Sequence, residues 1–227
     1  MLNYEIDPVV LLRLVPKGTE LDEWNGKTFV SMVGFLFLDT RILGVSVPFH
    51  QNFEEINLRF YVRYRAAEGW RRGVVFVKEI VPRLAIALTA RWLYNENYVA
   101  LPTGHVILRS RDDMNVESVK YYWRSRQITQ CIELAARGEA RPVAEGSQEE
   151  FISQHHWGYS SQRDGGTMEY RVEHVPWRVW QTESNGLDCG VEDLYGKAFV
   201  QALSARPSSA FLAEGSPVTV YRGRRIR

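Results

Sequence analysis

Cysteine and net charge are both scarce in this chain. Only two of the 227 residues are cysteines, Cys131 and Cys189, and they lack a Cys-x-x-Cys spacing, so no disulfide framework is implied. The formal net charge is +1, which gives no overall field to attract nucleic acid or an anionic membrane. We therefore expect no nucleic-acid partner.

Long hydrophobic runs are missing as well. Residues 1–18, MLNYEIDPVVLLRLVPKG, lack a basic segment followed by a long apolar one, and Arg13 interrupts the apolar stretch. We expect neither a leader peptide nor a membrane-spanning helix. Together with the low cysteine count, this predicts a reduced, cytoplasmic setting and no membrane partner.

Several motifs of catalysis and metal binding are absent. The patterns GxGxxG, GxxxxGK[ST] and GxSxG do not occur, which leaves nucleotide binding and the α/β-hydrolase mechanism without support. No HExxH or comparable spacing exists among the five histidines. The adjacent His155 and His156 would point about 100° apart on a helix. We expect neither a metal nor a cofactor.

Aromatic residues make up 12% of the chain, including seven tryptophans, and this composition favours sheet. Apolar runs and alternating patterns predict strands at residues 28–40, 56–65, 73–80, 105–110, 116–124, 127–135, 167–175, 209–212 and 218–222. Gly34, inside the first strand, suggests a bulge or a close approach. Helical spacing predicts helices at residues 82–95 and 191–203, and a capping box at Ser147 predicts a short helix over 151–159.

The remaining segments connect these elements. Residues 136–146 are polar and loop-like, and the C-terminal arginines are expected to form a frayed, solvated end. Many strands without a βαβ rhythm indicate an α+β, mainly β fold, in one domain over residues 1–227. An antiparallel barrel with two or three flanking helices would remove the exposed strand edges.

The segment FEEINLRFYVRY, residues 53–64, has an unusual alternation. Along the strand predicted at 56–65, one face carries apolar side chains and the other carries Asn57, Arg59, Tyr61 and Arg63. If helices cover the apolar face, Arg59 and Tyr61 line a cavity. If the apolar side chains fill the interior instead, Arg59 and Tyr61 face outward.

Several longer stretches carry a family resemblance. They are SMVGFLFLDTRILGVSVPFHQNFEEINLRFYVR, GVVFVKEIVPRLAIALTARWLYNENY, EEFISQHHWGYS, MEYRVEHVPW and FLAEGSPVTVY. Together they resemble the YqjF-like bacterial proteins, a domain of unknown function that is similar in fold to acetoacetate decarboxylase. The resemblance implies a cone-shaped, mostly antiparallel barrel with a central cavity.

The same resemblance implies a chemical difference. Acetoacetate decarboxylase has two adjacent lysines after a proline, and one of them forms a Schiff base because the other lowers its pKa. This chain has five lysines, none adjacent, and Pro102 is followed by Thr103. The fold resemblance therefore does not extend to the decarboxylase chemistry.

The candidate site residues come from the strands and from the segments beside them. Glu55 and Glu79 are candidate acids or bases, either in a cavity or in a structural salt bridge with an arginine. Lys78 is a candidate nucleophile if burial lowers its pKa, although a lysine on a strand is usually exposed. The candidate ligand-binding residues are Arg59, Tyr61, Arg83, His50, His174 and Tyr98, with Tyr94 and Glu96 beside Tyr98.

Two classes of function remain open at this point. One is a barrel that binds a small carboxylate- or carbonyl-containing metabolite and acts on it as an enzyme. The other is a non-catalytic ligand sensor or interaction module. Surface aromatics such as Trp70 and Trp180 would suit a homo-oligomer interface.

Overall fold

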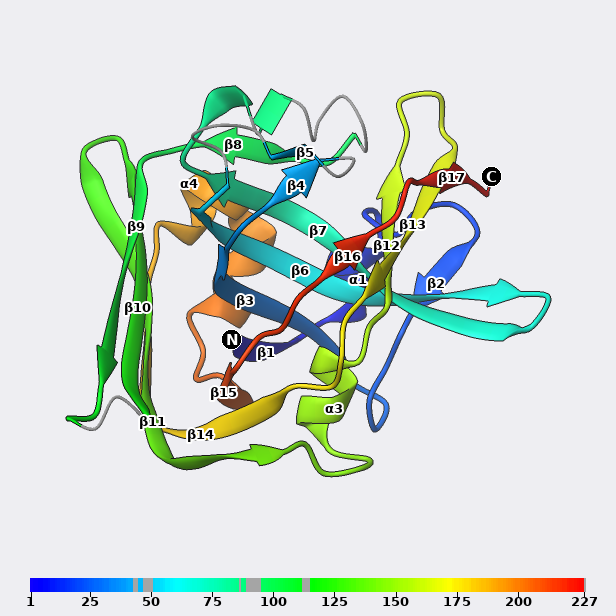
Figure 1. The fold of residues 1–227 in the computed structure, drawn as a ribbon. Coiled ribbons are helices and arrows are strands. Elements are labelled where there is room, and N and C mark those ends of the chain that lie inside the picture. The colour runs from blue at the N-terminus through cyan, green and yellow to red at the C-terminus, as the bar shows by residue number, and fades with distance from the viewer. Residues whose placement is uncertain (43–44, 47–50, 86, 89–94, 112–114, 227) are drawn as a thin grey trace.

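The computed structural model describes residues 1–42, 45–46, 51–85, 87–88, 95–111 and 115–226 (Figure 1). The strands are β1 (Leu2–Ile6), β2 (Thr19–Leu21), β3 (Thr28–Phe37), β4 (Arg41–Ile42), β5 (Val45–Ser46), β6 (Phe53–Ala66), β7 (Gly69–Val81), β8 (Tyr98–Ala100), β9 (Thr103–Arg109), β10 (Val116–Ser125), β11 (Ile128–Pro142), β12 (Trp157–Ser161), β13 (Thr167–Glu173), β14 (Arg178–Asp188), β15 (Ser209–Ala213), β16 (Thr219–Val220) and β17 (Arg224–Arg225). The helices are α1 (Pro8–Leu12), α3 (Gln148–Ser153), α4 (Val191–Tyr195), the 3-10 helix η1 (Lys197–Phe199) and α5 (Val200–Leu203).

One long sheet organises the described residues. Its strand order is β16-β13-β12-β7-β6-β3-β1-β15-β14-β11-β10-β9, with β2, β8 and β17 attached at the side. Most neighbours are antiparallel, but β12 and β8 run parallel to β7. The mainly β prediction is confirmed. Within the described residues the hydrogen-bonded path does not close on itself.

The β6–β7 hairpin forms the centre of this sheet, and its tip extends beyond the other strands at the right of Figure 1. The side chains of Ile56, Leu58 and Phe60 are fully buried on one face of β6. They belong to a cluster that includes Leu194 of α4 and Leu203 of α5, and Figure 1 shows α4 behind the central strands. The same cluster includes Trp123 of β10 and Ile132 of β11. Both helices and opposing strands therefore pack on the apolar face, and the structure does not decide between the two alternatives for this strand.

The structure of β3 confirms two predictions made from its sequence. The side chains from Thr28 to Val33 are all buried, as expected for a nearly continuous apolar run. At Gly34, a Cβ atom would lie 2.7 Å from the ring of Tyr121. The glycine therefore permits the close approach of an aromatic ring from β10.

Two predicted boundaries were wrong. The segment 136–146 was expected to be a loop, but β11 continues to Pro142 because residues 136–142 pair with β14. The short helix α3 has the predicted cap, since Ser147 Oγ accepts a hydrogen bond from the Glu150 amide at 3.1 Å. It ends at Ser153, however, and Trp157 already begins β12.

Two predictions about helices differ from the structure. The helix expected over residues 191–203 is divided at Gly196, whose φ of 92° favours glycine and ends α4. Four short α-helices are described, rather than the two or three expected. Most of the helix predicted at 82–95 lies outside the described residues.

The C-terminal arginines that the structure describes are exposed, as expected, but Arg224 and Arg225 are not frayed, because they pair with β13. Arg224 Nε lies 2.9 Å from a carboxyl oxygen of Glu169, and Arg225 pairs with Asp164. The side chain of Glu169 is fully buried. It also lies 2.7 Å from Arg71 and accepts a hydrogen bond from Tyr159. A buried carboxylate of this kind needs such partners.

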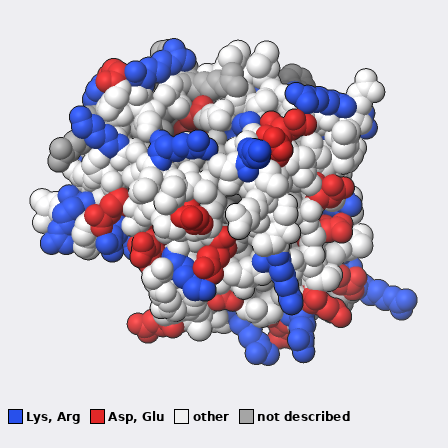
Figure 2. All heavy atoms as spheres, turned by 180° about the vertical axis from the view of Figure 1, so that it is seen from behind, with Lys and Arg blue, Asp and Glu red and all other residues white. Residues whose placement is uncertain are grey.

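Of the two tryptophans that were expected at the surface, only one is there. Trp70 is exposed, whereas Trp180 is buried, so Trp180 is not a surface aromatic. On the face seen in Figure 2, acidic and basic side chains are interspersed rather than gathered by sign. No helix among the described residues combines the length and hydropathy needed to cross a membrane.

Candidate functional site

The second face of the β6–β7 hairpin carries buried polar groups. We call this surface the polar face and define it by Glu55, Asn57, Arg59, Tyr61 and Glu79. The first four alternate along β6, and Glu79 of β7 lies directly opposite Asn57. Glu55, Asn57 and Glu79 are each at most 2% exposed. Burial of two carboxyl groups on one sheet face is uncommon in a protein core.

Hydrogen bonds hold Glu55 in place. Asn57 Nδ2 donates to Glu55 Oε1 at 3.0 Å, and the Tyr98 hydroxyl donates to Glu55 Oε2 at 3.2 Å. Burial raises the pKa of Glu55 to about 7, although these hydrogen bonds and the charge of Arg59 oppose the shift. A carboxyl group with such a pKa exchanges protons near neutral pH.

Two further glutamates extend this group, and we call Glu55, Glu79 and Glu96 the carboxyl cluster. Burial, followed by repulsion from Glu96 and Glu55, raises the pKa of Glu79 well above its usual value. Burial raises the pKa of the half-buried Glu96 to about 8, with a further contribution from Glu55. Hydrogen bonds join Glu79 to Tyr98 and to Glu96. Like charges this close favour protonated carboxyl groups.

Tyr170 of β13 supports the outer end of the cluster. Its hydroxyl donates to Glu96 Oε1. Across the strand pair, Tyr170 lies opposite Gly158 of β12, where a Cβ atom would be only 2.0 Å from the tyrosine ring. The ring therefore lies across the glycine, and this packing directs the hydroxyl toward Glu96.

Arg59 and Tyr61 occupy the other end of the polar face. Arg59 Nη2 donates to the Ile152 carbonyl at the end of α3 at 3.3 Å, and the guanidinium lies 5.9 Å from the centre of the Tyr61 ring. The Tyr61 hydroxyl and Ser31 Oγ are 2.5 Å apart. Arg59 Nη2 also lies 3.9 Å from Met1 Sδ, and among the described residues no carboxylate forms an ion pair with Arg59.

A histidine beside Tyr61 was not among the candidates. His155 is buried, its ring centre is 4.6 Å from that of Tyr61, and its Nε2 lies 3.5 Å from a carboxyl oxygen of Asp22. Burial lowers the pKa of His155 to about 4, although Asp22 opposes the shift. Arg72 donates to the same Asp22 oxygen at 2.6 Å. The imidazole is therefore neutral in this setting.

The other candidates lie apart from the carboxyl cluster. Lys78 lies on the opposite face from Glu79, as expected, and its Nζ donates to the Leu194 carbonyl of α4. Burial lowers the pKa of Lys78. Arg83 is exposed, and among the described residues no ion pair joins it to Glu55 or Glu79.

Of the two candidate histidines, the structure describes only His174. His174 is half-buried and stacks on Trp177 with ring centres 4.3 Å apart, and its Nδ1 lies 2.9 Å from the Val175 carbonyl oxygen. Burial lowers its pKa. His50 lies outside the described residues.

The sequence signal for the missed residues is weak. Tyr170 was assigned only to a strand face, and Gly158 to no element of the site. The positions of Tyr170 and His155 depend on how β12, β13 and α3 pack onto β7, and local periodicity does not give this information. The capping box at Ser147 was the usable clue, because α3 brings Ile152 to Arg59.

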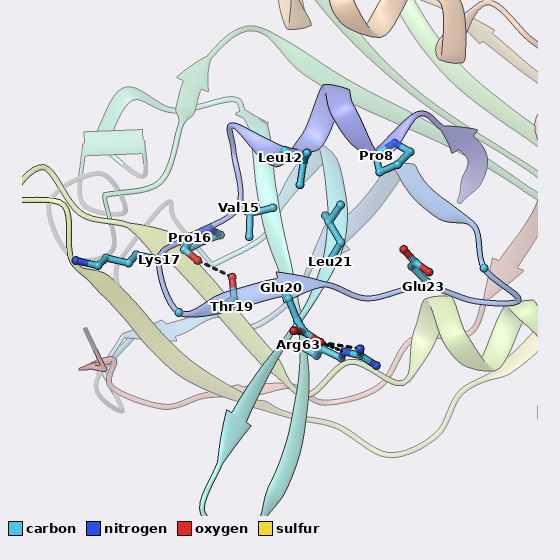
Figure 3. A pocket seen from close by; sticks show the side chains of 12 residues that line it. Pro8, Leu12, Val15, Pro16, Lys17, Thr19, Glu20, Leu21, Glu23 and Arg63 are labelled. Carbon is cyan, nitrogen blue, oxygen red and sulfur yellow. Dashed lines mark hydrogen bonds and ion pairs between the residues drawn. The ribbon is translucent and has the colours of Figure 1, made fainter.

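A surface groove lies elsewhere on the molecule (Figure 3). It has a volume of about 790 Å³, and the ion pair of Glu20 and Arg63 forms part of its lining. Apolar residues such as Leu12 and Leu21 line another part. None of the candidate site residues that the structure describes contributes to it. Within the described ranges, no group of three or more His, Cys, Asp or Glu side chains has a geometry that would hold a metal.

The sequence comparisons identify relatives of this chain. Residues 1–217 match the model of the family DUF2071, which is described as an uncharacterized conserved protein. The chain is 26% identical over 200 residues to the uncharacterized protein YqjF of Bacillus subtilis strain 168, which covers 86% of this chain and 77% of that relative. The expected resemblance to YqjF-like proteins is confirmed.

Solved structures show the same fold at low sequence identity. Acetoacetate decarboxylase of Legionella pneumophila has a TM-score of 0.64 and 13% identity, covering 100% of this chain and 83% of that one. The enduracididine biosynthesis enzyme MppR in complex with pyruvate has a TM-score of 0.65 and 11% identity, with coverage of 99% and 86%. An acetoacetate decarboxylase-like enzyme of Sphingomonas wittichii has a TM-score of 0.57 and 15% identity, with coverage of 100% and 89%. At these identities the likeness shows the fold alone.

Proposed function

We propose that this chain, which belongs to the DUF2071 family, binds a small carboxylate- or carbonyl-containing compound at the polar face. The observation that carries the proposal is the row of Glu55, Asn57 and Arg59 on one face of β6, in which Glu55 and Asn57 are buried and Arg59 is partly buried. Arg59 supplies a positive charge for an anionic or carbonyl oxygen. MppR has been solved with pyruvate, which agrees with a ligand of this class on this fold.

The long sheet is proposed to curve into the cone-shaped barrel expected from the sequence. Strand β9 is at one end of the hydrogen-bonded path, and β6 is in its middle. Thr103 Oγ1 of β9 lies 3.0 Å and His105 Nδ1 2.7 Å from carboxyl oxygens of Glu54 in β6. These contacts support the barrel because they connect an end strand to the centre of the sheet.

The chemistry that suits this site is proton transfer. Glu55, with a pKa of about 7, takes a proton from carbon next to a bound carbonyl and returns it to the same or a neighbouring atom. Hydrogen bonds run from Glu55 through Tyr98 and Glu79 to the half-buried Glu96. They form a path along which the proton of Glu55 exchanges with solvent. Lys78 has no part in the scheme, because its amine contacts α4 on the other face.

A binding experiment tests the proposal. Short carboxylates, including pyruvate and butyrate, are titrated against isotope-labelled protein by NMR, alongside their methyl esters. Arg59→Gln should weaken carboxylate binding at least tenfold, while the control Arg83→Gln leaves it unchanged. Affinity should fall as the pH rises through about 7 to 8, because Glu55 and Glu96 become negative there. If no carboxylate binds, or if both variants behave alike, the proposal fails.

A second measurement separates an enzyme from a ligand sensor. In heavy water, proton transfer by Glu55 would exchange the hydrogens next to the carbonyl of a bound keto acid for deuterium. Wild-type protein that binds the keto acid and accelerates this exchange is an enzyme, and Glu55→Gln should abolish the acceleration. Binding without accelerated exchange would identify a non-catalytic binding protein.

A further inference from the structure

Three buried polar atoms of the polar face have no hydrogen-bond partner among the described residues. They are Asn57 Oδ1, Glu79 Oε2 and Arg59 Nε. The side chains of Asn57 and Glu79 are each 1% exposed. Buried polar atoms in folded proteins are almost always paired, and an unpaired group is stabilised when a ligand supplies the missing partner.

Two of these atoms belong to residues that are neighbours across the strand pair. Asn57 and Glu79 lie directly opposite each other on β6 and β7, so their Cβ atoms are roughly 5 Å apart. The Asn57 amide nitrogen is already used by Glu55, which leaves its carbonyl oxygen as the unpaired atom. Arg59 is two residues further along the same face, roughly 7 Å from Asn57 along the strand.

The unpaired atoms differ in what they require. An amide oxygen can only accept a hydrogen bond, and a guanidinium N–H can only donate one. A ligand that satisfies both therefore carries an acceptor for Arg59 and a donor for Asn57. Burial and the neighbouring glutamates keep the pKa of Glu79 well above its usual value, which favours the protonated carboxyl group, a hydrogen-bond donor.

A hydroxyl group supplies a partner for both Asn57 and Glu79. It donates its hydrogen to the amide oxygen and accepts one from the protonated carboxyl group. An unsubstituted methylene at this place would leave both atoms unpaired, and a site built to bind a hydroxyl discriminates strongly against the analogue that lacks it.

We propose that the ligand is a short hydroxycarboxylate, with its carboxylate at Arg59 and its hydroxyl between Asn57 Oδ1 and Glu79 Oε2. The inference rests on the proposed function, since both place an acidic ligand at Arg59. It goes further by assigning the second polar contact and the substituent that makes it.

Matched ligands test this inference on wild-type protein. The probes are β-hydroxybutyrate, γ-hydroxybutyrate, butyrate and the methyl ester of β-hydroxybutyrate, each titrated by NMR at pH 6. At least one hydroxybutyrate should bind ten times or more tighter than butyrate. The methyl ester should bind at least tenfold more weakly than its acid.

A variant assigns the hydroxyl contact to Asn57. In Asn57→Leu the preference for the hydroxybutyrate over butyrate should disappear. Asn185→Leu, an exposed asparagine on β14, is the control and should keep the preference. The wild-type comparison stands without the variant if Asn57→Leu does not fold.

The outcomes separate this inference from the proposed function. If carboxylates bind through Arg59 but hydroxybutyrates and butyrate bind equally, the hydroxyl assignment is overturned and the proposed function stands. If the preference survives in Asn57→Leu, the hydroxyl lies elsewhere and the assignment is also overturned. If no carboxylate binds, both fail.

Discussion

Replacement of Glu55 by glutamine should change how the stability of the protein depends on pH. Glu55 is 2% exposed, and burial raises its pKa from 4.5 to about 7. Between these values the folded protein holds a proton that the unfolded chain has released. Raising the pH through this window therefore destabilises the wild-type fold. The amide of glutamine has a similar shape and does not titrate, so this pH dependence disappears.

The magnitude follows from the interval between the two pKa values. At about 1.4 kcal/mol for each pH unit, the wild type loses about 3 kcal/mol of unfolding free energy that Glu55→Gln retains. The loss is absent below about pH 4.5 and complete above about pH 7. Removing the charge at position 55 also relieves the repulsion that acts on Glu79 and Glu96, which changes stability in the same direction.

Glu54 provides a matched control of opposite sign. It precedes Glu55 on β6 and projects to the other face, where its oxygens contact Thr103 and His105. Burial opposes the shift, but hydrogen bonds led by that of His105 lower the pKa of Glu54. The contribution of Glu54 to the unfolding free energy is therefore present at neutral pH and lost as the pH falls. Glu54→Gln should be less stable than wild type at pH 7 and similar to it in acid.

Urea denaturation at several pH values from 4 to 8 measures both variants. The quantity compared is the difference in unfolding free energy between each variant and wild type at the same pH. For Glu55→Gln this difference should become more stabilising as the pH rises. A difference that stays constant over the range, or that falls, would refute the assignment of a buried, proton-holding carboxyl group to Glu55.

Two further substitutions examine the surroundings of the site. Gly158→Ala should displace the ring of Tyr170 and lower the free energy of unfolding by about 1–3 kcal/mol. It should also alter the titration of Glu96, which is followed by NMR. An unchanged Glu96 titration would contradict the positioning role of this glycine. Lys78→Met should lose the contact with Leu194, lower stability by about 1 kcal/mol and leave ligand affinity unchanged, and borohydride with keto acids should trap no adduct on wild-type protein. A trapped adduct on Lys78 would contradict its placement outside the site.

Local patterns in the sequence were sufficient to identify the central strand. The alternation along residues 56–63 depends only on the two-residue period of a strand, and it placed Asn57, Arg59 and Tyr61 on one face correctly. The capping box at Ser147 is equally local, because its hydrogen bond spans three residues. Such features are encoded by neighbouring residues and need no knowledge of the tertiary fold.

The partners of the site residues were harder to predict because they depend on packing. Arg83 was expected among the ligand-binding residues, yet the arginine whose charge acts on Glu55 is Arg59 of the same strand. The Tyr170 hydroxyl reaches Glu96 only because β12 and β13 pair in one register. The ion pair of the exposed Arg224 with the buried Glu169 likewise joins segments that are distant in the sequence.

The most direct test of the account is a carbon-13 NMR titration of the glutamate side-chain carboxyl groups. We predict one carboxyl resonance with a midpoint of about 7 that is missing from Glu55→Gln. We also predict a second resonance, with a midpoint of about 8, that shifts to lower pH in the same variant, because Glu55 raises the pKa of Glu96. If every glutamate titrates near its ordinary value of 4.5, the polar face holds no proton at neutral pH and the account is contradicted.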